Sequence, residues 1–263
     1  MEIGVSTACF YPELTENIPA RLQAIGVNTA EVFLNSESEY APEFCLALKE
    51  KLDTSGIKVV SVHSFVAQHE PFLFSDYQRR VTDAERIYRK VLSASLLLGA
   101  KYHTFHGARK EMLSKYFDAD GFAEKINYLA DVAGEYDIKL ALENVSWCVT
   151  HDIEFLKAVL PKLTSPHLGF TLDLKQARRA GFNYLEYVKL FSNRLLNVHI
   201  SDANDISDCL LPGDGDVDFS AVFRDLKAFG YKGDCIIEIY NNALTSDAHL
   251  KASVESLRKI ASE

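Results

Sequence analysis

The feature that most constrains the fold of this chain is an alternation of two hydrophobic periods, repeated eight times. In each repeat, an apolar segment with the period of a β-strand precedes a segment with the period of an amphipathic helix. The expected strands are Glu2–Phe10, Thr29–Asn35, Lys58–Phe65, Lys101–Gly107, Lys139–Val145, Leu168–Asp173, Leu195–Asp202 and Gly233–Tyr240. The expected helices begin near Glu16, Pro42, Tyr77, Gly121, Asp152, Asn183, Phe219 and Ser246.

Local signals support these boundaries. Gly26, Gly56, Gly99 and Gly230 each follow an apolar-periodic run, where a helix commonly ends in a left-handed residue. Asp218 precedes another such run and is a candidate N-cap. Eight repeats in 263 residues predict an α/β fold, a single (β/α)8 TIM barrel, over a doubly wound open sheet. No linker composition interrupts the chain, so residues 1–263 are expected to form one domain.

Composition narrows the class of protein. The formal net charge of −9 argues against a nucleic-acid partner, which usually selects a basic surface. No apolar run reaches the roughly 20 residues needed to cross a membrane, and no secretory signal is recognisable at the start. The five cysteines include no C-x-x-C spacing and are expected to be free thiols. These signals predict a cytoplasmic enzyme.

Side-chain alternation indicates which strand face lines the barrel. Phe105 alternates with Thr104 and His106, while Ile237 and Ile239 flank Glu238. Residues two apart share a face, so the large apolar side chains are expected to pack against the outer helices. The polar residues then point inward near the carboxyl ends of their strands, where the active sites of such barrels lie. This inward set is His63, His106, Glu143, Asp173, His199 and Glu238.

Such a set is difficult to explain as structure alone. Carboxylates buried close together repel one another and are costly to desolvate. A divalent cation removes that cost, and imidazole with carboxylate ligands suits a transition metal. The sequence therefore predicts a metal centre at the barrel mouth.

Seven segments in order resemble the xylose isomerase-like TIM barrels. They read SVHSF, YHTFHGA, LALENVSW, GFTLDLKQA, NVHISD, LLPGDGDVDF and CIIEIY. This superfamily includes sugar and sugar-phosphate isomerases and epimerases and, more distantly, endonuclease IV. The resemblance covers essentially the whole chain, although each motif is short.

The ketose 3-epimerase branch of this superfamily implies specific roles. Its metal tetrad matches Glu143, Asp173, His199 and Glu238. The resemblance implies one divalent ion (Mn, Zn, Co or Mg), with Glu143 and Glu238 as opposed acid and base. It implies isomerisation or epimerisation of a small sugar through an enediolate.

Endonuclease IV provides the contrast. The resemblance to it matches His63 and His106, but its D-x-x-H motif reads Asp173-Leu-Lys-Gln176 here. Its later D-x-H motif is also missing, because residues 202–213 contain no histidine. Nuclease activity is therefore disfavoured.

Substrate contacts are expected from His63, His106, Gln176, Trp147 and Arg109. For the two histidines, a structural role or a second metal stays open. The aromatic residues of 65–77 are read as either a lid or a subunit contact, so a homo-oligomer is possible. His69, His103, His151, His167 and His249 are treated as unremarkable.

Other charged residues leave alternatives open. Arg109, Lys110, Lys175 and Arg178 form a phosphate clamp or are solvated charges, with an unphosphorylated substrate slightly preferred. Glu31 either orients a catalytic group or pairs with a basic residue. The run Asp214-Gly-Asp216-Val-Asp218 lacks the features of an EF-hand and is read as a helix-capping turn near the site.

Three alternatives to the isomerase accompany this interpretation. One is a metal-dependent dehydratase of an inosose or dehydroshikimate type, which begins with the same proton abstraction. The others are a catalytically silent sugar-binding barrel and the disfavoured nuclease.

Overall fold

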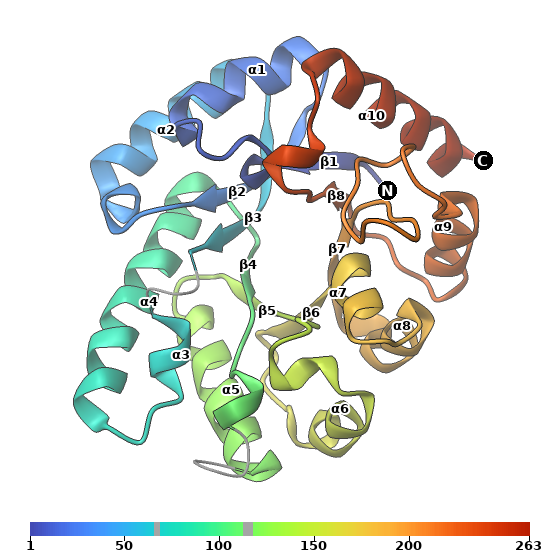
Figure 1. The fold of residues 1–263 in the computed structure, drawn as a ribbon. Coiled ribbons are helices and arrows are strands. Elements are labelled where there is room, and N and C mark those ends of the chain that lie inside the picture. Colours follow the sequence, from blue (N-terminus) through green and yellow to red (C-terminus); the bar gives the residue numbers. More distant parts are fainter. Residues whose placement is uncertain (66–68, 113–117) are drawn as a thin grey trace.

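The chain folds into a closed barrel of eight parallel strands surrounded by helices, as Figure 1 shows along the barrel. The computed structural model describes residues 1–65, 69–112 and 118–263. The strands are β1 (Ile3–Ser6), β2 (Thr29–Leu34), β3 (Lys58–Ser64), β4 (Tyr102–Phe105), β5 (Lys139–Glu143), β6 (Leu168–Asp173), β7 (Leu195–Ile200) and β8 (Cys235–Ile237). The ring closes where β8 pairs with β1, with Gly4 opposite Ile236. The predicted TIM barrel is confirmed.

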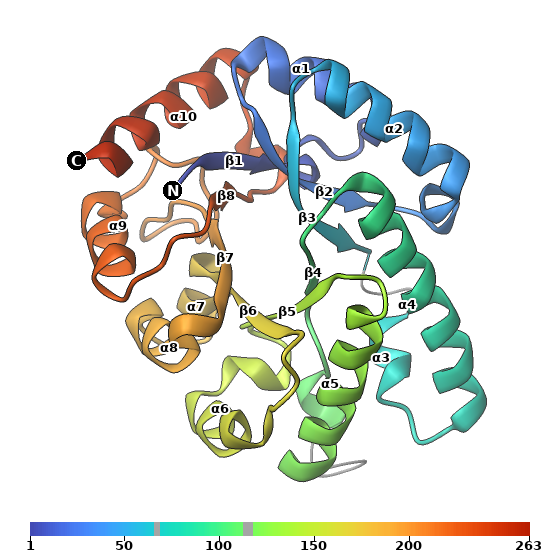
Figure 2. The same ribbon diagram turned by 180° about the vertical axis from the view of Figure 1, so that it is seen from behind.

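The helices follow the expected alternation. They are α1 (Ile18–Ile25), α2 (Pro42–Thr54), α3 (Glu70–Leu73), α4 (Gln78–Leu98), α5 (Ala119–Gly134), α6 (Ile153–Val159), α7 (Leu174–Arg179), α8 (Tyr184–Phe191), α9 (Phe219–Ala228) and α10 (Asp247–Ser262). Figure 2, from the opposite side, shows the same outer ring of helices around the strands. Gly26 and Gly99 end α1 and α4 in the left-handed conformation that the sequence predicts there. Asp218 caps α9 by accepting the amide of Ala221 at 2.9 Å.

Several expectations about boundaries need correction, and β4, β5 and β7 each end two residues earlier than predicted. The first strand is shorter than predicted, because residues Thr7–Phe10 turn into a 3₁₀ helix capped by Ser6. The last strand is also shorter and ends at Ile237. The short helices α3 and α7 were not predicted, since four and six residues are too few to establish a helical period.

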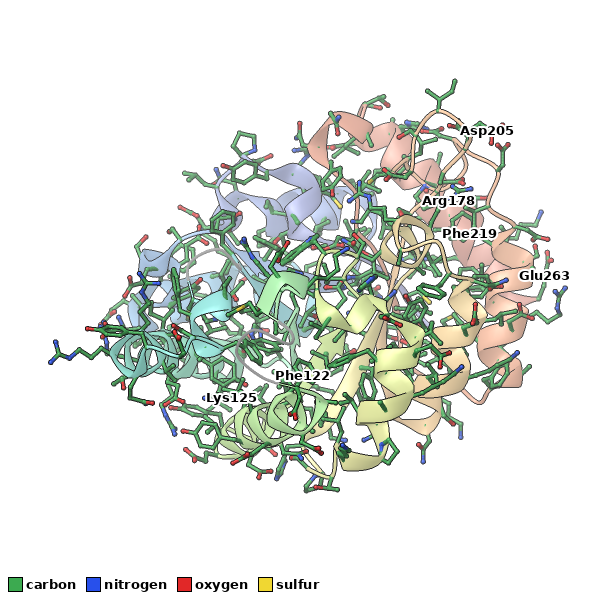
Figure 3. All side chains as sticks on the ribbon, turned by 60° about the horizontal axis from the view of Figure 1, so that its bottom comes forward. Phe122, Lys125, Arg178, Asp205, Phe219 and Glu263 are labelled. Carbon is green, nitrogen blue, oxygen red and sulfur yellow. The ribbon has the colours of Figure 1, made fainter. Side chains whose placement is uncertain are left out.

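The outer side of the barrel carries the main apolar core. Phe105 and Phe170 lie on this side and are fully buried, as the alternation predicts. The surrounding helices are amphipathic, and Figure 3 labels two residues of α5 that illustrate it. Phe122 is buried beneath the helix, while Lys125 is partly exposed and pairs with Glu85 at 3.6 Å. Burial of such faces drives the ring of helices onto the barrel.

The barrel interior changes character along its axis. At the amino ends of the strands, a small apolar cluster fills the interior; it contains Val60, Tyr102, Ala141 and Ile236. Two residues further along the strands come Thr104 on β4 and Glu143 on β5, and four residues beyond Tyr102 comes His106. Because residues two apart share a face, an apolar floor gives way to a polar mouth.

All five cysteines are buried and free. Among the described residues, no helix is long and apolar enough to cross a membrane.

Candidate metal centre and active site

Four predicted metal ligands meet at the carboxyl ends of four neighbouring strands. Glu143 ends β5, Asp173 ends β6, His199 lies near the end of β7, and Glu238 directly follows β8. Each contributes a ligand atom, and these atoms all lie within 4.8 Å of one another. Asp173 and His199 are also direct partners in the register of β6 and β7. The strand ends thus gather side chains that are up to 95 residues apart in sequence.

His199 is oriented by a carboxylate beneath it. Its Nε2 atom lies 3.1 Å from Oε2 of Glu31, while Nδ1 lies 3.5 Å from Oε1 of Glu143 and 3.4 Å from Oε2 of Glu238. With a metal ion bound, Nε2 would donate to Glu31 and the lone pair of Nδ1 would face the ion. Without one, the charges of Glu31 and Glu238 raise the pKa of the imidazole well above its ordinary value, against the effect of burial. A carboxylate behind the imidazole is a usual partner of a metal-ligating histidine.

Glu31 is itself held inside the barrel. Its Oε2 atom accepts hydrogen bonds from Ser61 and Thr104, both at 2.8 Å, and from Asn197 at 3.4 Å. The carboxyl group is fully buried. Of the two alternatives for Glu31, the structure favours orientation of a site residue, because its ionic partner is His199.

The donor set fits a divalent metal ion. Asp173 Oδ2 and His199 Nδ1 are buried and have no hydrogen-bond partner among the described residues. The other oxygen of Asp173 accepts the amide of Gln176 at 2.9 Å, which fixes the carboxylate at the start of α7. Burial, reinforced by Glu143 and Glu238, raises the pKa of Asp173 to about 7 against the opposing charge of Lys175. A cation between these carboxylates would relieve that repulsion, and the N/O ligand set is one that first-row metals accept.

The sequence predicts Lys175 to be either a solvated charge or part of a phosphate clamp, and the structure shows that it is neither exposed nor unpaired. It is only 4% exposed, and its Nζ lies 3.3 Å from Glu238 Oε2 and 3.5 Å from Asp173 Oδ2. Burial would raise the pKa of Glu238, but the positive charges of His199 and Lys175 instead lower it to about 2. The useful signal was position: Lys175 is two residues beyond a ligand, on the first turn of α7.

His63 and His106 form a second row beside the tetrad. Their Nε2 atoms are 3.1 Å apart, and His106 Nε2 is also 3.1 Å from Glu143 Oε2. Burial opposes ionisation of Glu143, yet the nearby imidazoles of His106 and His199 hold its pKa well below its ordinary value. With Glu143, the two histidines form another group of three metal-type ligands. Substrate contact and a second metal therefore both remain compatible with the geometry.

A cavity of about 750 Å³ opens above these groups. Aromatic side chains, among them Trp147 and Tyr240, contribute to its lining, and the Trp147 ring centroid lies 5.2 Å from that of His106. Gln176 also reaches the cavity, where its Oε1 accepts from the amide and hydroxyl of Ser146. The cavity is lined by Ala8, Tyr11, Phe33, Asn35, His63, Phe65, His106, Glu143, Trp147, Lys175, Gln176, Glu238, Ile239, Tyr240, Asn241 and Asn242.

The basic residues considered for a phosphate clamp do not converge on this cavity. Arg109 stacks on Trp147, 5.6 Å from the ring, but does not line the cavity. Arg178, labelled in Figure 3, lines a different hollow of about 440 Å³ next to α8. Lys175 is already paired with Glu238. Direct substrate contact by Arg109 stays a prediction.

The considered lid and the acidic turn lie mostly outside the cavity lining. Residues 66–68 of the lid lie outside the described part of the chain, and Phe74 is buried against Phe122. Phe65 does line the cavity. Asp202 accepts three amides of the following loop, and Asp218 caps α9, so the acidic run serves as a capping turn.

Comparison with known proteins decides the family. A family model described as a xylose isomerase-like TIM barrel matches residues 19–260. The chain belongs to this family. A curated relative, an uncharacterised protein of Methanocaldococcus jannaschii, is 26% identical over 275 residues, which cover 100% of this chain and 92% of that protein.

Solved structures of other proteins share the fold. D-psicose 3-epimerase of Clostridium cellulolyticum H10, solved with D-tagatose, has a TM-score of 0.82 at 15% identity, covering 99% of both chains. IolI, solved with a bound zinc atom, has a TM-score of 0.80 at 18% identity, covering 100% of this chain and 98% of that one. At these identities the likeness establishes the barrel and leaves the reaction to the site itself.

Proposed function

We propose that this chain is a divalent-metal-dependent isomerase or epimerase of a small, unphosphorylated sugar or related polyhydroxy ketone. The observation that carries the proposal is the position of two glutamates on one cavity. Glu143 and Glu238 both line it, and each lies within 3.5 Å of His199 Nδ1. Two carboxylates that approach a bound carbon from different strands are what proton removal on one face and return on the other require.

The residues favour ionised glutamates before the substrate binds. The nearby imidazoles of His106 and His199 lower the pKa of Glu143, and the charges of His199 and Lys175 lower that of Glu238, in both cases against the effect of burial. Either carboxylate can therefore accept a proton from the carbon beside a carbonyl group. A divalent ion held by Glu143, Asp173, His199 and Glu238 would supply a Lewis acid for that carbonyl oxygen.

His106 extends the path of the proton from Glu143. Its Nε2 lies 3.1 Å from Glu143 Oε2 and 3.1 Å from His63 Nε2, so both groups are close enough for a proton taken by this carboxylate to pass along the cavity wall. Among the described residues, no pair of histidines like His63 and His106 lies beside Glu238. Lys175 contacts Glu238 instead. The two glutamates are therefore suited to different halves of the reaction.

The cavity lining supports a neutral, hydroxyl-rich substrate. The amides of Asn35, Asn241 and Asn242 can donate to and accept from hydroxyl groups, and Trp147 offers an apolar face to a sugar ring. Among the described lining residues, Lys175 is the one basic side chain apart from histidine, and it is paired with Glu238 and Asp173. A phosphate group would meet no unpaired cation there.

The test is a panel of ketoses and inososes in deuterated water, read by NMR with protein loaded with Mn²⁺, Co²⁺, Mg²⁺ or Zn²⁺. We expect deuterium at one carbon of one substrate, with formation of its epimer or isomer. Loss of water instead would assign the dehydratase alternative. Absence of exchange with every metal, together with substrate binding by calorimetry, would leave the silent sugar-binding barrel and overturn the proposal.

A further inference from the structure

A second group of metal-type ligands lies on the outer side of the barrel, away from the cavity. It consists of His69 and Glu70, at the start of α3, and His103 on β4. His103 occupies the strand face opposite to Thr104, so it points from the barrel wall toward the helices. All three residues are completely buried. We refer to them as the outer cluster.

The outer cluster contains several unsatisfied polar atoms. Both ring nitrogens of His69, Oε1 of Glu70 and Nε2 of His103 are buried and have no hydrogen-bond partner among the described residues. Each such atom costs on the order of 1–3 kcal/mol if it stays unpaired. Four of them in one place need an explanation other than ordinary packing.

The remaining polar atoms of the cluster form hydrogen bonds to the backbone. These bonds leave the unpartnered atoms of His103 and Glu70 with lone pairs available to a ligand. His103 Nδ1 lies 3.0 Å from the carbonyl of Val62, which makes Nδ1 the protonated nitrogen and Nε2 the free acceptor. Glu70 Oε2 accepts the amide of His106 at 3.0 Å, which leaves Oε1 free. The nearby hydroxyl of Tyr88 donates to Leu129 at 3.0 Å and is not available to the cluster.

The charges at the outer cluster are also those of a metal site. Burial lowers the pKa of His69 to about 4 and that of His103 to about 3, so both imidazoles are neutral and able to ligate. Burial raises the pKa of Glu70 to about 7, so its ionised form lacks a sufficient positive partner. No Lys or Arg ion pair reaches Glu70 within the described part of the chain.

From this geometry we propose that His69, Glu70 and His103 bind a structural divalent transition-metal ion of the zinc class. One ligand atom from each residue lies within 4.8 Å of the other two, the same separation that encloses the tetrad at the barrel mouth. Two imidazoles and one carboxylate are ligands that zinc accepts, with the second oxygen of Glu70 or a water molecule completing the coordination. The proposal does not depend on the proposed reaction.

The ion would join α3 to the barrel wall beneath the active site. Glu70 already holds the backbone of His106, and the side chain of His106 contacts Glu143 at 3.1 Å. Binding at the outer cluster would therefore fix the backbone from which His106 reaches the cavity. None of the three residues lines the cavity, so their role is positional.

The first test counts zinc in the full chain by mass spectrometry after loading and desalting. We expect about two ions per wild-type chain and about one in the double variant Glu70→Gln, His103→Gln. The double variant Asp173→Asn, His199→Gln should also keep about one, because its outer cluster is intact. As a matched control, His249→Gln changes a surface histidine and should keep the wild-type count.

The two proposals fail in different ways in this experiment. An outer-cluster variant with the same zinc content as the wild type would overturn the inference made here. A tetrad variant with unchanged content would instead contradict the proposed metal centre at the barrel mouth.

The second test needs no variant and so does not depend on the folding of an altered core. Crystals of the wild-type protein grown with Zn²⁺ would be measured above and below the zinc absorption edge. We expect an anomalous peak between His69, Glu70 and His103. A map with a peak at the tetrad and none at the outer cluster would refute the proposal, since both sites experience the same zinc concentration.

Discussion

The tetrad and the outer cluster use the same side-chain chemistry on opposite faces of one barrel wall. Both combine imidazole with carboxylate, and both contain buried atoms without hydrogen-bond partners. They differ in what surrounds them. The tetrad lies beneath a cavity of about 750 Å³, whereas the outer cluster lies between β4 and the short helix α3.

This difference predicts a catalytic role for the tetrad and a stabilising role for the outer cluster. A ligand set that opens to a cavity leaves coordination positions for a substrate, whereas an enclosed set can only hold structure together. The charges agree with this division. Glu238 has Lys175 and His199 to keep it ionised, but no lysine or arginine pairs with Glu70 among the described residues.

The largest effects are expected from replacing one glutamate of each site by glutamine. Glu143→Gln should lower kcat by about 10²–10⁴-fold, because it removes a group that transfers protons. Glu70→Gln should instead lower the free energy of unfolding of the zinc-loaded protein by about 2–3 kcal/mol, if the ion is present at roughly 100 times its dissociation constant. Rates by NMR and denaturant unfolding would be measured on both variants. Full turnover by Glu143→Gln would remove the distinction between the regions.

A smaller effect is expected from Glu31→Gln, which changes the carboxylate behind His199. Loss of the charge should weaken metal binding at the tetrad by about 10–100-fold, as for other partners of ligating histidines. Binding at the outer cluster should not change, because Glu31 contacts only residues inside the barrel. Competition with a coloured chelator would measure both affinities, and the surface variant Glu135→Gln is the control. Equal weakening at both sites would indicate general unfolding.

The smallest effect should follow from Lys175→Met. Its positive charge is one of those that lower the pKa of Glu238, so its removal should raise that pKa. The ionised base would then be lost at a higher pH, and the acid limb of kcat/KM should move upward by about one pH unit. The exposed substitution Lys157→Met should leave the profile unchanged. An unchanged limb in Lys175→Met would show that Glu238 is not the group that titrates there.

The position of the four tetrad residues at the barrel mouth could be predicted because its signal is local. Each residue lies within one position of the end of its strand, and the alternation of Thr104 with Phe105 or of Glu238 with Ile237 identifies the inner face. The eight strands and their order followed from the same periodicity, while the ends of several strands did not, those of β1 and β8 least of all. A strand ends where its hydrogen bonds to the neighbouring strands stop, which periodicity does not show. After β1, the chain forms a 3₁₀ helix at Thr7–Phe10, which Ser6 caps.

The outer cluster was missed for a physical reason. His103 was set aside because its parity is outward, and His69 because it lies in a connecting segment. The outer face of a barrel strand is buried by helices, so a polar residue there needs a partner as much as one inside. Which residue of a helix provides that partner depends on how the helix packs on the strand. In addition, α3 has only four residues, too few to show a helical period in the sequence. The same limit concealed Lys175, whose burial depends on the turn from β6 into α7.

The closure of the ring by β8 also determines when the tetrad can exist. Its four ligands come from four successive strands, and Glu238 is positioned only after its amide bonds to Ile200 at 3.1 Å and β8 pairs with β1. A chain emerging from the ribosome therefore has at most three of these ligands until its last strand is made. The outer cluster needs only β4 and α3, and its last ligand, His103, precedes Glu238 by 135 residues. The ligands of the outer cluster are therefore synthesised before the barrel can close, whereas the tetrad is complete only when it closes. Metal binding at the two sites would follow the same order.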